Sequence, residues 1–372
     1  MTEAGSLELT LHRLWNGQGS PMLRGILVAA AGVYRGALVA RQACYGTGLF
    51  SSGRLPVPVI SIGNLTLGGS GKTPLTALVA AILCDLGAHP AVVSRGYGRR
   101  TRGVHVVADR DGVRLDAKEA GDEPRLLGEQ LPGLPVVVGE SRYEAGRVAI
   151  ERCGADVLVL DDGFQHRTLA KDLEILAVEG REPWGNGRLF PRGGLREPLS
   201  ALRRAHLVVV TNPAGTGVAQ QVEWSLRREG SHAAVLSGAY RAEALREGDK
   251  RPQSPGMLSG RRVLALAGLA APSGFVATLT SLGATVVELL AFPDHHSYRA
   301  TDLERVRLSA QRSDAEWVVT TEKDWVRLRE VPALGWPLRV LSVRLDMGAD
   351  QPALVETLGR TLRSKTAGQV RP

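Results

Sequence analysis

Cysteine is scarce in this sequence, and its scarcity excludes two classes of protein. Only three cysteines occur among 372 residues, Cys44, Cys84 and Cys153, and none has a close partner in the chain. A disulfide framework needs paired cysteines, and a structural zinc site needs closely spaced ligands. Neither is predicted, and the reducing cytoplasm is the compartment that fits.

Long uninterrupted apolar runs are also lacking. In the most apolar segment, residues 22–45, Arg24 and Arg35 bracket the run G-I-L-V-A-A-A-G-V-Y. This run is short for a spanning helix, which needs about 20 apolar residues, and it lacks the features of a secretory signal. Arg24 and Arg35 lie within about 20° of each other on a helical wheel, with Arg41 about 100° away. We predict a helix that docks on a membrane with its arginines toward anionic headgroups; a helix packed on the core is the alternative.

Aromatic residues and acidic residues are in short supply as well. Aromatics make up 5% of the chain, and 46 Lys+Arg against 38 Asp+Glu give a formal charge of +8. A basic protein suits nucleotides, acidic lipids or nucleic acid, although a solvated basic surface without a partner gives the same charge. Without a basic stripe or clustered aromatics, no nucleic-acid partner is predicted. The ordinary hydrophobic content of 44% excludes wholesale disorder.

Apolar, β-branched runs alternate with helical patterns along the rest of the chain. Continuous apolar strands separated by helices indicate a parallel sheet covered on both faces. Strands are predicted at 57–62, 91–94, 104–108, 135–139, 156–162, 173–178 and 206–212, with helices such as 74–87 and 141–154 between them. A second series has apolar runs at 262–268, 285–292, 317–324 and 339–343. The polar region 246–260 resembles a connector, so we expect a domain boundary between residues 212 and 261.

A glycine-rich loop follows the first predicted strand: G-N-L-T-L-G-G-S-G-K-T-P, residues 63–74. Glycines let backbone N–H groups turn inward around a phosphate, and the start of the next helix adds partial positive charge. In such loops the lysine, here Lys72, reaches the outer phosphates, and the threonine, here Thr73, ligates magnesium. The predicted phosphate-binding residues are Gly68, Gly69, Ser70, Gly71, Lys72 and Thr73.

This loop departs from the strict pattern G-x-x-x-x-G-K-[ST], which requires glycine where the chain has Thr66. A G-K-T sequence on its own could equally belong to an ordinary turn that binds no phosphate. The apolar strand before it and the helical pattern after it favour a phosphate site.

Two carboxylates end another predicted strand, in D-V-L-V-L-D-D-G-F-Q-H. Asp161 and Asp162 lie where parallel sheets bind their ligands, and a nucleotide site needs a second acidic contact to magnesium at such a place. We predict that Asp161, Asp162 and Thr73 serve the metal. A strand-ending Asp-Gly turn is the alternative.

Further polar clusters suggest an acceptor for the phosphoryl group. They are S-R-G-Y-G-R-R (94–100), A-G-D-E-P-R-L-L (120–127), N-G-R-L-F-P-R-G-G-L-R-E-P (186–198), F-P-D-H-H-S-Y (292–298) and T-T-E-K-D (320–324). Phosphoryl transfer to an alcohol needs a base near the hydroxyl. Asp122 with a histidine partner fits that role, although Asp122 before a helix also fits simple N-capping.

Together these motifs resemble those of tetraacyldisaccharide 4'-kinases, the lipid A 4'-kinases of Gram-negative bacteria. The chain carries G-N-L-T-L-G-G-S-G-K-T-P, S-R-G-Y-G, G-D-E-P, D-D-G-F-Q-H, N-G-R-L-F-P-R-G-G-L-R-E-P, F-P-D-H-H and T-E-K-D in the family's order, over residues 14–328. The shifted glycines around Thr66 belong to the resemblance. The departures are Phe190, Arg192 and Gly194, which bear on acyl or headgroup contacts.

The resemblance implies an activity, a partner and a location. The activity is magnesium- and ATP-dependent phosphorylation of the 4'-hydroxyl of a tetraacyldisaccharide 1-phosphate, forming lipid IVA. The partner is this lipid A precursor, at the cytoplasmic face of the bacterial inner membrane, reached through the N-terminal helix. No obligate protein partner is predicted.

The resemblance also assigns roles to residues. Lys72 and Asp122 would be catalytic, with His295 as the partner of Asp122, although His296 is not excluded. The residues expected at the substrate are Arg95, Tyr97, Gln165, His166, Arg196 and Glu197.

The predicted fold class is therefore α/β. It comprises an N-terminal helical membrane-docking segment (1–50), a P-loop NTPase-like parallel-sheet domain (51–225) and a smaller C-terminal α/β domain (226–372), with the site in the cleft between the domains. The rival interpretation is a membrane-associated P-loop ATPase or GTPase acting as a switch or metallochaperone. T-E-K-D has Thr321 and Glu322 where a guanine-reading N-K-x-D loop needs asparagine and lysine, so GTP is not supported.

Overall fold

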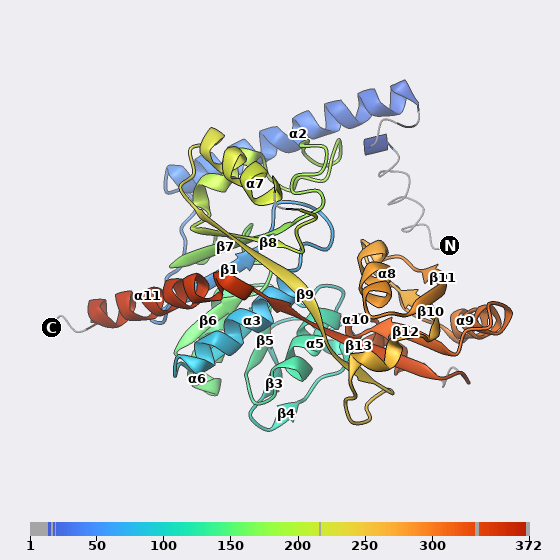
Figure 1. Ribbon diagram of the computed structural model, residues 1–372. Helices are drawn as coiled ribbons and strands as arrows, with labels where there is room; N and C mark the ends of the chain where they lie inside the picture. The colour runs from blue at the N-terminus through green and yellow to red at the C-terminus, as the bar shows by residue number, and fades with distance from the viewer. Residues whose placement is uncertain (1–13, 16–17, 19, 216, 332–334, 370–372) are drawn as a thin grey trace.

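The computed structural model describes residues 14–15, 18, 20–215, 217–331 and 335–369, with the backbone alone for 366–369. Residues 1–13 of the predicted docking segment lie outside this part. Within it, a 13-stranded sheet has the order β11-β10-β12-β13-β9-β8-β7-β1-β6-β2-β5-β3-β4 (Figure 1). The strands are β1 (Val59–Gly63), β2 (Pro90–Ser94), β3 (His105–Asp109), β4 (Gly112–Val113), β5 (Val136–Val138), β6 (Val157–Leu160), β7 (Leu173–Glu179), β8 (Leu207–Thr211), β9 (Ala234–Arg246), β10 (Arg262–Ala267), β11 (Thr285–Ala291), β12 (Trp317–Thr321) and β13 (Leu338–Asp346).

The central strands are parallel, as their continuous apolar runs predict. β8, β7, β1, β6, β2 and β5 pair in parallel, and β1, β2, β5, β6 and β8 are buried along their whole length. At the edge, β3 pairs antiparallel with β5 and β4 antiparallel with β3. The predicted α/β class with a P-loop NTPase-like sheet is confirmed, with this antiparallel edge as an addition.

Helices cover both faces of the sheet. Those that position the site or pack on the sheet are α3 (Lys72–Asp85), α5 (Asp122–Gln130), α6 (Arg142–Cys153), α7 (Gly217–Arg228), α8 (Pro272–Ser281), α9 (Ala300–Arg312), α10 (Glu322–Leu328) and α11 (Gln351–Gln369). Leucines of α3, α5 and α11 share one apolar cluster with alternate residues of β1 and β7, whereas α6 and α7 pack on the opposite face. The second half of the sheet consists of β10 to β13, and the first half of β1 to β8. In the second half, α8 and α9 cover opposite faces of β10, because they contact alternate residues along it.

One strand joins the two halves of the sheet. The first part of β9 pairs parallel with β8, and the rest pairs antiparallel with β13 (Figure 1). β9 is not predicted from the sequence, because A-V-L-S-G-A-Y-R-A-E-A-L-R is neither continuously apolar nor strictly alternating. The C-terminal α11 packs back on the cluster around α3 through Leu354 and Leu358. The division into domains at residues 51–225 and 226–372 stays a prediction.

The N-terminal helix α2 (Pro21–Gly46) lies at the periphery (Figure 1). Within the described chain no residue of α2 is buried, so the alternative of a core-packed helix is wrong. Six of its large apolar side chains are exposed: Met22, Leu23, Ile26, Val28, Val33 and Val39. The 26-residue helix, with a mean hydropathy of 1.5 over its most apolar window, is long and apolar enough to cross a membrane by length and composition alone.

Candidate functional site

The glycine-rich loop connects the buried strand β1 to α3. Gly71, the residue before α3, has a left-handed φ of 78°. A Cβ on Gly71 would lie 2.2 Å from Tyr240 Oη and 2.9 Å from Thr211 Cγ2, so no other residue fits without moving the loop. Ser70 is buried, and its Oγ has no hydrogen-bond partner among the described residues. The loop therefore holds a buried polar atom beside a helix N-terminus, which suits an anion.

Thr66, where the strict pattern requires glycine, pairs with a second loop. Thr66 forms an isolated antiparallel bridge with Leu195, and the N–H of Leu67 donates to the carbonyl of Gly194 at 2.7 Å. The first part of the loop is thus bonded to the long polar loop 186–198. This pairing brings Arg196 to the P-loop.

Asp161 and Asp162 follow β6 and differ in environment. Asp161 is 1% exposed and accepts hydrogen bonds from the hydroxyls of Thr76 at 3.3 Å and Ser94 at 3.2 Å. Burial, with the nearby Glu123 and Asp162 carboxylates, raises the pKa of Asp161 to about 7. A large fraction of Asp161 is therefore protonated near neutral pH when no cation is bound.

Asp162 is held ionised by cations. Its backbone has a left-handed φ of 52°, which is uncommon outside glycine. Its carboxylate accepts two hydrogen bonds from Arg196 Nη1, at 3.1 and 2.9 Å, and lies 3.7 Å from the ammonium of Lys72. Burial alone would raise the pKa of Asp162, but Lys72 and Arg196 outweigh burial and the pKa is lowered.

The opposite shifts of these two neighbours give a stability prediction. An unfolded aspartate titrates near pH 3.9, so the folded chain holds more protons on Asp161 between about pH 4 and its pKa of about 7. Stability from this group is therefore lost as pH rises through that window. We expect Asp161→Asn to raise the melting temperature by a few degrees at pH 8 and to give no gain near pH 4, measured by calorimetry in EDTA without nucleotide.

The matched control is Asp162→Asn, which should lower the melting temperature at pH 8 because it removes an ionised partner of Arg196. A lower melting temperature for Asp161→Asn at pH 8 would show that its two hydroxyl contacts outweigh the buried charge.

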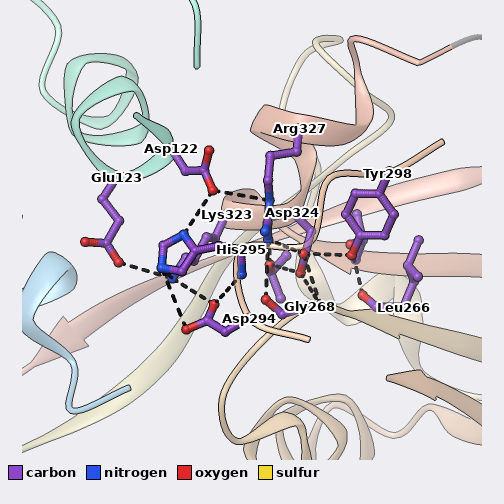
Figure 2. A network of polar contacts seen from close by, with 12 residues as sticks. Asp122, Glu123, Leu266, Gly268, Asp294, His295, Tyr298, Lys323, Asp324 and Arg327 are labelled. Atoms are coloured by element: carbon purple, nitrogen blue, oxygen red, sulfur yellow. Dashed lines mark hydrogen bonds and ion pairs between the residues drawn. The ribbon is translucent and has the colours of Figure 1, made fainter. Parts of the chain in front are cut away.

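Asp122 and His295 come together from the two halves of the chain. Asp122 is the first residue of α5, and His295 follows β11 with a left-handed φ of 56°. His295 Nδ1 lies 3.1 Å from Asp122 Oδ2 (Figure 2). His296 instead contacts Asp302, through Nε2 at 3.0 Å, so the structure places His295 and not His296 against Asp122. The N-cap of α5 is Gly121 and Asp122 makes no capping bond, so the N-capping alternative is wrong.

Arg95 and Tyr97 follow β2 at the same edge of the sheet. Both are exposed, and the Tyr97 ring lies 5.6 Å from the His295 ring, centroid to centroid. Gly121 has a φ of 90°, and a Cβ there would lie 2.8 Å from the Tyr97 carbonyl. Close contact between these two loops therefore brings Tyr97 next to the Asp122–His295 pair.

The other predicted substrate residues lie beside α2. Gln165 Nε2 donates to the carbonyl of Asn64 at 2.9 Å, and the Gln165 carbonyl accepts from Arg41 of α2 at 2.7 Å. Tyr34 of α2 donates to the carbonyl of Arg196 at 2.8 Å. The P-loop surroundings and the peripheral helix are thus directly bonded.

Glu197 and His166 are already engaged by neighbouring side chains. Glu197 is bound by both Nη atoms of Arg204, at 2.9 and 3.0 Å, and lines a cavity of about 120 Å³ with Arg35, Leu38, Arg41 and Arg167. His166 Nε2 contacts the hydroxyl of Thr168 at 2.7 Å. Burial, reinforced by Arg142 and other cations, lowers the pKa of His166 to about 4, so this ring is neutral at pH 7.

The structure brings to the Asp122–His295 pair two residues for which the sequence predicts no role. Lys323 contacts Glu123, Asp294 and His295, and Arg327 Nε lies 3.5 Å from Asp122 Oδ2. The sequence signal for Lys323 is the polar stretch T-E-K-D, which directly follows a predicted strand. Arg142, the first residue of α6, likewise has no predicted role; it is buried, and its Nη1 lies 3.4 Å from the carbonyls of Gly139 and Glu140.

Three comparisons with known proteins agree. A family model described as tetraacyldisaccharide-1-P 4'-kinase matches residues 23–363. The tetraacyldisaccharide 4'-kinase of Anaeromyxobacter dehalogenans is 46% identical over 323 residues, covering 86% of this chain and 85% of its own. That of Syntrophus aciditrophicus is 43% identical over 348 residues, covering 90% and 93%. The crystal structure of LpxK from Aquifex aeolicus in complex with ATP superimposes with a TM-score of 0.70 at 31% identity, covering 90% of this chain and 99% of that one.

Proposed function

The chain belongs to the tetraacyldisaccharide-1-P 4'-kinase family, and from this premise we propose that it transfers the γ-phosphate of ATP to the 4'-hydroxyl of a tetraacyldisaccharide 1-phosphate. The product would be lipid IVA, an intermediate of lipid A biosynthesis. The observation that carries the proposal is the Asp122–His295 contact of 3.1 Å, a base with an oriented partner. The P-loop lies at the carboxyl ends of the same sheet.

The P-loop would bind the triphosphate. Gly68, Gly69, Ser70 and Gly71 would offer backbone N–H groups, and Lys72 would contact the terminal phosphates. The left-handed Gly71 and the buried, unpaired Ser70 Oγ support this role. The ammonium of Lys72 is 3.7 Å from Asp162, beyond hydrogen-bonding distance, and so keeps its donors for an anion.

Magnesium is proposed at Thr73, Asp161 and Asp162. Mg²⁺ is usually bound by one or two carboxylates with substrate phosphates and waters. The described residues contain no group of three or more His, Cys, Asp or Glu arranged to hold a metal, and two adjacent carboxylates beside a P-loop fit that sparse donor set. Bound magnesium would neutralise charge on the transferring phosphate.

Asp122 would accept the proton of the 4'-hydroxyl. Its Oδ2 is engaged by His295, which leaves Oδ1 to face the acceptor. Arg95, Tyr97, Gln165, His166, Arg196 and Glu197 would contact the disaccharide. The bonds from α2 to the residues around the P-loop support an acceptor that enters from the side of this helix.

Docking of α2 on the cytoplasmic leaflet of the inner membrane completes the proposal. The exposed apolar side chains of α2 support it. We expect the double variant Ile26→Glu and Val33→Glu to lose flotation with vesicles of phosphatidylethanolamine and phosphatidylglycerol, because both side chains are exposed and lie seven residues apart on one face. Leu308→Glu, at an exposed position of α9 in the other half of the chain, should float as the parent does. Equal flotation of all three proteins would place the membrane contact elsewhere.

The decisive experiment is a transfer assay with γ-labelled ATP, magnesium and a tetraacyldisaccharide 1-phosphate in detergent micelles. Label should move to the lipid, and omission of either lipid or magnesium should abolish the lipid product. The rival ATPase or GTPase switch, or metallochaperone, would hydrolyse nucleotide at a rate that the lipid does not change. Family membership does not favour that rival.

A further inference from the structure

The T-E-K-D stretch, to which the reaction gives no role so far, faces the proposed base. β12 ends at Thr321, and α10 begins at Glu322 with the Thr321 hydroxyl as its N-cap acceptor. Lys323 therefore lies in the first turn of α10. Its ammonium lies 3.4 Å from Nε2 of His295, whereas Nδ1 of the same ring is the nitrogen next to Asp122 (Figure 2).

Lys323 has three acceptors for its three hydrogens. Its ammonium lies 3.1 Å from Glu123 Oε1, 3.1 Å from Asp294 Oδ1 and 3.4 Å from His295 Nε2. A lysine ammonium donates and has no lone pair to accept. As a hydrogen bond, this contact makes Nε2 of His295 the acceptor and assigns the ring proton to Nδ1, 3.1 Å from Asp122 Oδ2.

We infer that Lys323 is a positioning residue that holds His295 as its neutral Nδ1–H tautomer, so that the ring donates to Asp122 Oδ2 and leaves Asp122 Oδ1 to take the proton of the acceptor. This inference rests on the proposed role of Asp122. In the transfer step the hydroxyl proton moves to Oδ1 as the acceptor oxygen bonds to the γ-phosphorus and the bond to ADP breaks. His295 keeps its proton throughout.

The charges around the ring show why a cation is needed there. The titratable groups that face it are Asp122 and Glu123 on α5, Asp294 in the adjoining loop, Lys323 and Arg327 on α10, and Tyr97 in the loop after β2. Three carboxylates attract a second proton to the imidazole. The cations oppose that proton, and Lys323 is the one in contact with Nε2.

Lys323 remains charged over the working pH range. Burial lowers the pKa of a lysine, but Glu123 and Asp294 outweigh burial here and the pKa of Lys323 is raised. The position of α10 is also fixed by a buried carboxylate. Asp324 is 0% exposed and accepts from Gly268 N–H, the hydroxyls of Tyr298 and Thr321, and Arg327 (Figure 2). Lys323 is thus held against the ring by a rigid helix start.

The test compares Lys323→Met with Lys118→Met in the full-length protein. Lys118 bonds Glu330 at 2.7 Å, joining the same two halves without touching the Asp122–His295 pair. It therefore controls for simple loss of a contact between the halves. The readouts are the ¹⁵N shifts of His295, assigned with His295→Gln, and the pH dependence of kcat/KM.

For Lys323→Met we expect His295 to lose the Nδ1–H tautomer and to take up a second proton at higher pH than in the parent. The acid limb of kcat/KM should move up by about one pH unit, and kcat at pH 7 should fall by about tenfold with the KM for ATP unchanged. Lys323→Arg should retain the tautomer, because arginine also only donates. Lys118→Met should leave both readouts unchanged.

An Nδ1–H tautomer and an unmoved acid limb in Lys323→Met would overturn the inference, as would equal effects in Lys118→Met. Thermal melts identify a variant that fails to fold, in which case the parent's tautomer and Lys323→Arg decide the question. A parent that shows the tautomer but transfers no phosphate to lipid would contradict the proposed function and not the role of Lys323.

Discussion

Asp122→Asn is expected to reduce kcat for phosphoryl transfer by about 10²–10⁴-fold, the usual contribution of a positioned acid or base. Asparagine has nearly the same shape, and its carbonyl oxygen can still accept from His295 Nδ1, but it cannot take a proton. ATP affinity should stay within about twofold of the parent, because the contacts of Asp122 run to His295 and Arg327 in the other half of the chain and the P-loop is built from β1 and α3. Single-turnover transfer and isothermal titration with ATP measure the two effects.

A neighbouring pair provides the control for this variant. His296 contacts Asp302 at 3.0 Å, close to the 3.1 Å between His295 and Asp122. Asp302→Asn removes the same charge from a similar pair on α9 and should leave kcat within about threefold of the parent. Loss of ATP affinity in Asp122→Asn, or an equal loss of kcat in Asp302→Asn, would mean that Asp122 supports the fold and is not the base.

Lys72→Met should lower kcat by about 10²–10³-fold, as removal of one preorganised donor does, and should also weaken ATP binding. Lys72 is the first residue of α3, and its side chain is 11% exposed next to Asp162. Methionine fills the same space without charge, so the packing of the loop is kept. Stopped-flow binding of a fluorescent ATP analogue and the transfer assay separate affinity from rate.

Lys250→Met is the control for Lys72→Met. Its ammonium pairs with Glu247 and its side chain is 72% exposed, so it should behave as the parent does. Transfer by Lys72→Met within about threefold of the parent would remove the lysine from the reaction and with it the proposed phosphate site.

The strands of the P-loop half could be predicted because they are buried on both faces. A continuously apolar run such as 157–160 has few interpretations in an α/β chain. β9 was not predictable by the same reasoning, since part of it is half-exposed and its burial is mixed. Its position depends on strands β8 and β13, which lie far apart in the sequence.

The candidate site was predictable where local sequence builds it and obscure where distant segments meet. The P-loop and the acidic pair each occupy one stretch of chain. The contact between Asp122 and His295 spans 173 positions, and that between Glu123 and Lys323 spans 200. The sequence alone does not tell which of the adjacent residues His295 and His296 contacts Asp122. In the structure His295 has a left-handed φ, and the two rings have different partners: Asp122 for His295 and Asp302 for His296.

The shared strand β9 limits how the two halves can move. β8 is hydrogen-bonded to its first part and β13 to the remainder, so sliding or pulling the halves apart would break ladder bonds. A ribbon of two strands is more strongly twisted than a wider sheet. We therefore expect the two halves to move relative to each other by twisting about the β9–β13 ribbon. Because the ladder bonds stay intact in such a motion, α5 and the loop that carries His295 would return to the same alignment.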